Sequence, residues 1–177
     1  MYLRLTTKPV EQISRILTPD IEAEMIDGAY WLRRPGPNPD CVIVAMGAVM
    51  SEAIDAVGQL ADKRRDVGLL AVTSADRLNA GWTAATRARA KGHQAPLSAI
   101  ERHLAPLASH TLLVTVLDGH PATLSWIGGV RGHRIVSLGV EHFGQCGTIR
   151  DLYRHFEIDA RAILEAVQSA TSGRPII

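Results

Sequence analysis

The chain has 177 residues, of which 46% are hydrophobic and 21% charged, and its formal net charge at pH 7 is +1. This length suits one domain with a substantial core, plus at most a short appendage, and the composition is that of an ordinary globular protein. Because a nearly neutral chain has no general attraction to phosphate backbones or anionic lipid, nucleic acid and membrane surfaces are disfavoured as partners.

The sequence carries no signal for a membrane or for export. Its longest apolar run, residues 41–49, is far too short to cross a bilayer, and its first residues lack the features of a secretory signal. Cys41 and Cys146 are the only cysteines, and two isolated thiols are typical of a reducing compartment. We therefore expect a cytoplasmic protein, with Cys41 buried because it opens an apolar run.

The first forty residues differ from the rest. Residues 2–5 alternate like a strand, whereas residues 8–28 show little periodicity. Residues 30–32 indicate another short strand, which ends at segment 35–40. Three prolines in that segment fix backbone angles and remove hydrogen-bond donors, so a stiff loop is predicted there.

From residue 41 onward, strand patterns alternate with helical ones. Strands are predicted at 41–46, 69–72, 112–117 and 134–138, and the continuous apolar run at 41–46 is typical of a strand buried on both faces. Each parallel crossover passes over one face of the sheet. The pattern therefore predicts a three-layer α/β/α domain with a mostly parallel sheet of about five strands. Residues 30–32 would form the fifth strand, at an edge, where it could run antiparallel.

Helices fill the intervals between these strands. Helical patterns follow residue 47, span about 74–91, run through 97–107 and begin at 120–121. Two more close the chain. Thr148 with Asp151 forms a capping-box pattern, and Asp159 is the expected N-cap of the last helix, with Ile158 and Ile163 placed as a hydrophobic staple.

Ligands of such sheets bind at the carboxyl ends of the strands, here at loops 47–51, 73–77, 118–121 and 139–147. Five residues in the last two loops are candidates: Asp118, His120, His142, Phe143 and Cys146. The first loop has a lone glycine and no phosphate-binding motif, which favours a tight turn over a phosphate cradle.

Each candidate also has a structural interpretation. Asp118 and the histidines at 120, 133 and 142 match no zinc-binding spacing, and His120 is placed to cap the following helix. Cys146 lies just before a helix start, which can activate a thiol, but without an identifiable partner base a small residue in a turn is favoured. The basic cluster at 87–93 fits a solvated helix end better than a site for an acidic partner.

Residues 30–167 resemble the C-terminal domain of transketolases and of the thiamine-diphosphate-dependent components of 2-oxo-acid dehydrogenases. The stretches that carry this resemblance are residues 40–49, 72–78, 138–147 and 152–159. The most specific is the ending G-x-x-x-F-G-x-x-G followed by L-x-x-x-F-x-I-D. Within this family, the chain most resembles the homodimeric pyruvate dehydrogenase type. The segment Asp118–Pro121 favours the dehydrogenases over the transketolases but leaves the substrate open.

The resemblance also implies a division of the chain. Residues 2–9 look like the last strand of the preceding, pyrimidine-binding domain. Residues 1–28 would then be a remnant of that domain plus a linker, and residues 29–177 the C-terminal domain of a longer polypeptide.

What the resemblance implies about chemistry is a structural role. Members of this family hold magnesium and diphosphate with a Gly-Asp-Gly motif and a distant asparagine pair. Asp27-Gly28 and Asp118-Gly119 lack the leading glycine, and no Asn-Asn occurs. We therefore expect no catalytic, cofactor-binding or metal-binding residue in this chain, with thiamine diphosphate and magnesium held elsewhere in the parent enzyme. Expected partners are a second copy of the subunit, the preceding domains and other components of a 2-oxo-acid dehydrogenase complex.

Two other functions remain open from the residues alone. One is a free-standing small-molecule-binding module that uses the strand-end loops, and the other is a thiol enzyme built on Cys146.

Overall fold

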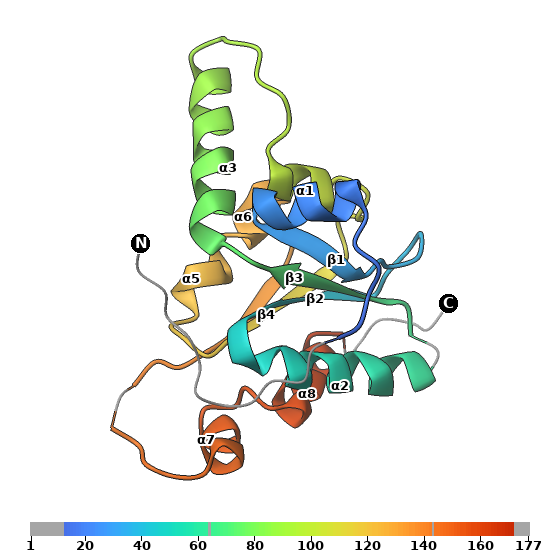
Figure 1. Cartoon of the computed structure of the whole chain (residues 1–177), viewed down its shortest axis with the longest axis vertical. Helices are drawn as coiled ribbons and strands as arrows, with labels where there is room; N and C mark the ends of the chain where they lie inside the picture. Colours follow the sequence, from blue (N-terminus) through green and yellow to red (C-terminus); the bar gives the residue numbers. More distant parts are fainter. Residues whose placement is uncertain (1–12, 64, 143, 172–177) are drawn as a thin grey trace.

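The computed structural model describes residues 13–63, 65–142 and 144–171, and the strand predicted at residues 2–5 lies outside them. Figure 1 shows a central sheet between two layers of helices. Its strand order is β1-β3-β2-β4-β5. The strands are β1 (Ala29–Arg33), β2 (Cys41–Met46), β3 (Val67–Val72), β4 (Leu112–Leu117) and β5 (Ile135–Leu138). β1 pairs antiparallel with β3, and the other pairings are parallel, which confirms the predicted architecture.

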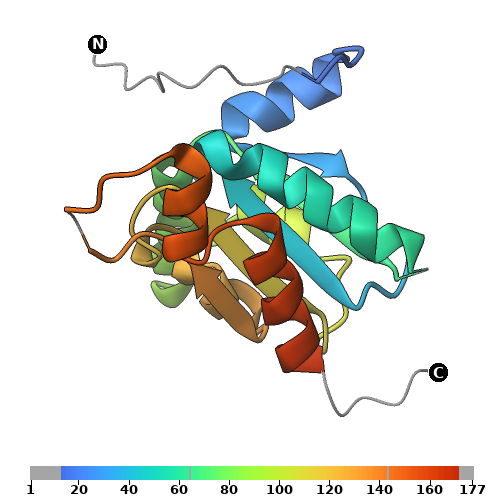
Figure 2. The ribbon, with the colours of Figure 1, turned by 90° about the horizontal axis from the view of Figure 1, so that it is seen from below.

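Helices cover both faces of the sheet. One face carries α2 (Met50–Asp62) and α8 (Ala160–Thr171), which lie side by side in Figure 2. The other carries α3 (Ala75–Ala90), α4 (Ala99–Leu104), α5 (Ala122–Ser125) and α6 (Gly128–Arg131). The short 3-10 helix η1 (Gly47–Val49) links β2 to α2, and α7 (Ile149–His155) precedes α8. Within the described ranges, no helix has the length and apolar character needed to cross a membrane.

Burial of the central strands explains why the sequence predicts them well. Every residue of β3 and β4 is buried, as are the first five of β2. Successive side chains enter opposite cores, so Ile43 packs toward α2 and α8 while Val44 packs toward the other layer. Because neither face meets water, no polar alternation interrupts these runs.

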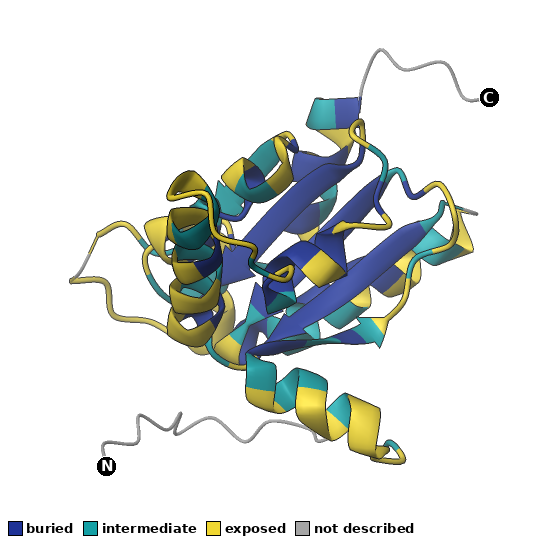
Figure 3. Cartoon of the chain, turned by 90° about the horizontal axis from the view of Figure 1, so that it is seen from above, coloured by how far each residue is buried: buried dark blue, intermediate teal, exposed yellow. Residues whose placement is uncertain are grey.

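Helix α1 (Pro19–Asp27) forms where the sequence shows little periodicity. Its ends are set locally: Thr18 Oγ1 accepts from the backbone N–H of Ile21, Pro19 occupies the first turn, and Gly28 ends the helix with φ +114°. None of its residues is buried, and Figure 3 shows it largely exposed beside the sheet. A helix without a buried face has no apolar stripe for periodicity to detect.

The last two helices start at the predicted N-caps. Thr148 Oγ1 accepts from the N–H of Asp151 at 3.3 Å and donates to Asp151 Oδ2 at 2.6 Å, in place of the reciprocal bond of a full capping box. Asp159 Oδ1 accepts from the N–H of Ala162 at 2.9 Å, and Ile158 and Ile163 are buried in one cluster. The two N-cap predictions are therefore confirmed.

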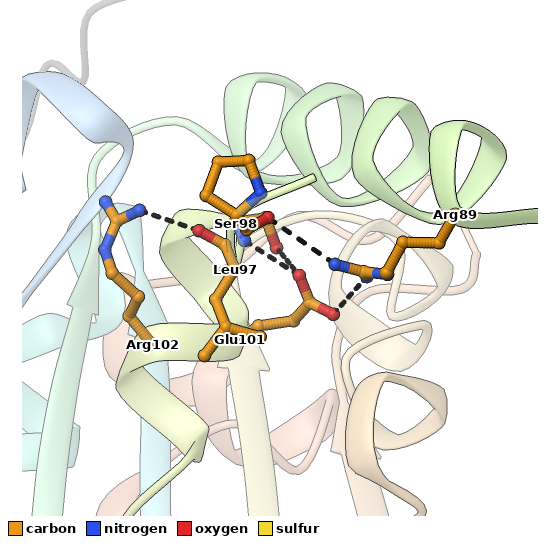
Figure 4. A network of polar contacts seen from close by, with 6 residues as sticks. Arg89, Leu97, Ser98, Glu101 and Arg102 are labelled. Atoms are coloured by element: carbon orange, nitrogen blue, oxygen red, sulfur yellow. Dashed lines mark hydrogen bonds and ion pairs between the residues drawn. The ribbon is translucent and has the colours of Figure 1, made fainter. Parts of the chain in front are cut away.

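A polar network joins the end of α3 to the start of α4 (Figure 4). Glu101 is only 7% exposed; one carboxylate oxygen accepts from the backbone N–H (2.8 Å) and the hydroxyl (2.7 Å) of Ser98, and the other pairs with Arg89. Burial by itself raises the pKa of Glu101, but the bonds from Ser98 and Arg89 outweigh it and hold that pKa below its ordinary value. The sequence favours a solvated basic cluster at residues 87–93. Arg89 differs from that expectation, because it pairs with the buried Glu101.

The first prediction concerns this network. Glu101→Gln should lower the free energy of unfolding by about 2 kcal/mol, because Arg89 then loses its partner charge and Ser98 its strong acceptor. In the unsubstituted chain the contribution of Glu101 should be complete above the ordinary glutamate pKa of 4.5 and disappear as pH falls through the lower folded value. Urea denaturation at several pH values measures both effects.

Glu165→Gln is the matched control, because Glu165 pairs with Arg161 on the exposed surface of α8 and exposed ion pairs contribute little. Equal losses of stability in the two variants would contradict a special role for Glu101.

The second prediction concerns two buried histidines. His103 Nε2 donates to the carbonyl of Ala29 at 3.0 Å, and His133 Nδ1 donates to that of Thr111 at 3.2 Å. Burial lowers the pKa of both side chains below the ordinary 6.5. The unfolded chain therefore takes up protons at a higher pH than the folded chain, and stability should fall as pH drops below about 6.5.

His103→Gln keeps a donor for Ala29 but removes the titrating ring, so it should flatten this pH dependence in urea denaturation. The exposed His93→Gln substitution should leave the dependence unchanged. An identical slope in the His103 variant would show that the titration lies elsewhere.

Candidate functional site

The carboxyl end of the sheet contains a topological switch point between β2 and β4. These strands are neighbours, but the chain after β2 enters α2 on one face, whereas the chain after β4 enters α5 on the other. In open α/β sheets the crevice outside such a switch point is the usual ligand site. Here it lies between the loops that begin at Gly47 and Asp118.

The exposed side chain of Asp118 lies beside Gly47 at this point. Gly47 has φ +83°, and a Cβ at this position would lie only 2.5 Å from Asp118 Oδ1. Glycine is therefore required for both the turn and the close approach of the carboxylate. The geometry is that of a tight turn against an acidic side chain.

A second carboxylate makes the surroundings more negative. Glu52, in the first turn of α2, accepts from the N–H of Ala160 at 3.1 Å and so occupies the N-terminus of α8. Burial raises the pKa of the nearby Tyr153, and the charges of Asp118 and Glu52 raise it further. A diphosphate would meet electrostatic repulsion at this end of the sheet.

The loop after β4 presses against the loop after β5. Gly119 O accepts from the N–H of Val140 at 2.8 Å, and a Cβ on Gly139 would lie 2.5 Å from the same oxygen. His120 Nδ1 accepts from the N–H of Ala122 at 3.2 Å. This confirms the helix-capping interpretation of His120 and commits one of its ring nitrogens to the backbone.

The remaining candidates lie on a projecting loop. His142 and Cys146 are exposed, as are all described residues of 141–147, and Phe143 lies outside the described residues. Figure 1 shows this loop leaving the body of the domain before it returns to α7. No hydrogen bond links any two of Asp118, His120, His142 and Cys146 in the described part of the chain.

The possible metal ligands and the buried thiol can each be placed in the described part of the chain. Among the described residues, no group of three or more His, Cys, Asp or Glu side chains could hold a metal ion. Burial raises the pKa of the Cys41 thiol to about 12, so this cysteine stays protonated at neutral pH, as its predicted burial implies.

Two open recesses were not predicted. One, of about 570 Å³, lies between α2, α7 and α8 and is lined by Glu52, Gln59, Ile149, Arg150, Tyr153, Arg154, Asp159, Ala160 and Arg161. The other, of about 410 Å³, lies between α3 and α5 and is lined by Ala75, Asp76, Asn79, Ala80, Thr123 and Trp126. Both join residues from elements distant in sequence, and a contact of this kind leaves no local pattern.

Solved structures share this fold. The transketolase from Leishmania mexicana matches with a TM-score of 0.59 and 21% identity over 86% of this chain and 19% of its own length. A mutant transketolase from Pichia stipitis in complex with xylulose 5-phosphate matches with 0.58 and 19% identity, over 85% of this chain and 19% of its own. A split-gene transketolase described as an inactive β4 tetramer matches with 0.57 and 16% identity, over 89% and 46%.

This chain therefore spans about a fifth of the length of the first two transketolases and about half of the split-gene chain. A search of curated proteins finds no match. At the level of sequence families, the model of the transketolase-like TK C-terminal domain matches residues 28–159, well over half of the chain. The chain therefore belongs to the transketolase-like C-terminal domain family.

Proposed function

We propose that this chain is a structural, non-catalytic domain of a thiamine-diphosphate-dependent enzyme that acts in the cytoplasm on a 2-oxo acid or a ketose. Its role is to associate with a second copy of the subunit and to support the domains that hold thiamine diphosphate and magnesium. The likeness of residues 138–159 to the homodimeric pyruvate dehydrogenase type favours the 2-oxo acid.

The observation that carries this proposal is an apolar surface on the segment before the domain. Ile13, Ile16, Leu17 and Ile26 have exposed fractions of 50%, 87%, 53% and 62%. They are four of the six large hydrophobic residues that are exposed in the described part of the chain. A cluster of this kind within 14 consecutive positions is typical of a surface that another protein surface covers.

The same segment also makes polar contacts with the domain. Asp27 pairs with Arg102 at 2.8 Å and Glu24 with Arg34 at 2.7 Å. Earlier in the segment, Arg15 donates to the carbonyl of Trp31 on the edge strand at 3.2 Å. Polar contacts therefore hold the segment in place while its apolar side chains face outward, so the surface is available without unfolding.

Two further observations agree with a structural role. The switch-point crevice holds the carboxylate of Asp118, which disfavours a diphosphate there. The split-gene transketolase, whose chain resembles this one over 46% of its length, is described as a tetramer of β chains. We infer that this chain likewise associates with copies of itself.

The third prediction tests the absence of cofactor chemistry. Titration of the chain with thiamine diphosphate and magnesium in a calorimeter should give no saturable heat up to about 1 mM ligand. Saturable binding in the micromolar range would contradict the proposal, because the cofactor would then have a site within these residues.

The fourth prediction tests the surface. In light scattering coupled to gel filtration, the chain should form dimers or larger assemblies, and a double substitution of Ile16→Asp and Leu17→Asp should shift it toward the monomer by at least about tenfold in dissociation constant. Ile149→Asp, an exposed apolar position on α7, is the matched control and should not change the assembly. A chain that is monomeric before substitution would contradict self-association through this segment.

A further inference from the structure

Two tryptophans stack at the carboxyl end of the sheet, although 43 residues separate them in sequence. Trp82 on α3 and Trp126 just after α5 have ring centroids 5.4 Å apart and an interplanar angle of 21°. Trp126 Nε1 donates to the carbonyl of Thr123 at 2.9 Å, so its indole is fixed at the edge as well as on the face. Both rings remain partly exposed, which leaves a rigid aromatic surface in contact with water.

The recess of about 410 Å³ lies beside this stack. Figure 1 shows α5 next to the N-terminal end of α3, and the recess lies between these two elements. Asp76, Asn79 and Ala80 project from one side of α3 because residues three and four apart share a helix face. Thr123 and Trp126 form the facing wall, and Trp82 supports Trp126 from outside the recess.

Three polar side chains in this recess are available for a ligand. Asp76 offers acceptors, while the Asn79 amide and the Thr123 hydroxyl offer donors and acceptors. Within the described residues, none of the three side chains takes part in a hydrogen bond or an ion pair of the chain. The donors at the start of α3 are not the basis of the site, because the Ser74 hydroxyl already accepts from the N–H of Arg77.

We propose that this recess, formed by Asp76, Asn79, Thr123 and Trp126, binds a neutral, hydroxylated ring such as a monosaccharide unit. The C–H face of a sugar ring is apolar and fits against indole, while neighbouring hydroxyls donate to the carboxylate and exchange hydrogen bonds with the amide and the hydroxyl. This site goes beyond the proposed structural role, does not depend on it and lies outside the crevice at Gly47.

Other ligand classes fit the lining less well. A phosphorylated compound requires a cation, but Asp76 is the only charged side chain among the described residues that line the recess, and its charge would repel the phosphate. A purely apolar ring would bury the polar groups of Asp76, Asn79 and Thr123 without partners.

The fifth prediction uses the tryptophans as reporters. Methyl β-D-glucopyranoside, added to the ¹⁵N-labelled chain, should shift the indole N–H signals of Trp82 and Trp126 saturably, with a dissociation constant of about 1–10 mM. Trp31, which is 5% exposed and packs against His103, is the internal control and should not move. Asn79→Ala and Asp76→Asn should each weaken binding about tenfold, because a hydroxyl of the sugar then loses a hydrogen-bond partner.

Asn38→Ala, at an exposed loop position, is the matched control variant and should bind as the unsubstituted chain does. Three results would overturn the proposal: shifts that do not saturate and that glycerol reproduces at equal concentration, an unchanged affinity in the Asn79→Ala chain, or tighter binding of glucose 6-phosphate than of the neutral glycoside.

Discussion

Strand β2 lies between two parallel neighbours and two helical layers, and its side chains from Cys41 to Ala45 are removed from water completely. A strand that is apolar on both faces forces the chain to place helices on both sides of the sheet. In this order of strands, the connections after β2 and β4 must leave on opposite faces. The crevice between Gly47 and Asp118 is therefore a consequence of how the core is buried.

An acidic side chain lies at that crevice. Many α/β proteins place backbone N–H groups and a cation at this point, and anionic ligands bind there. Here Asp118 lies against Gly47, and Glu52 accepts from the N-terminus of α8. The recess proposed to bind a ligand lies instead where α3 and α5 meet, and Asp76 is the one charged residue among the described residues that line it. Under the function proposed above, this domain would not compete for the diphosphate.

The sequence predicts the parts of this structure that depend on local composition. β2 has the predicted limits because it is an uninterrupted apolar run, and β4 because only the buried Thr115 interrupts its apolar residues. Thr148, Asp159 and His120 cap helices because capping acts over a few residues. The stack of Trp82 on Trp126 could not be predicted in this way, because it depends on how two crossovers pack against the same face. Spacing likewise does not reveal that the loop with His142 and Cys146 projects away from Asp118, since a loop's path depends on tertiary contacts.

The N-terminal segment shows how a surface can be rigid without being buried. No residue of helix α1 is fully buried, and only Ile21 and Met25 among its apolar residues are half-buried. The caps at Thr18 and Gly28 and the ion pairs of Glu24 and Asp27 add to its order. These contacts are made with the domain, whereas the side chains of Ile16, Leu17 and Ile26 remain largely exposed. Because the segment is already ordered, a partner that covers it loses little conformational entropy on binding. Its affinity would then depend mainly on the apolar area that becomes buried.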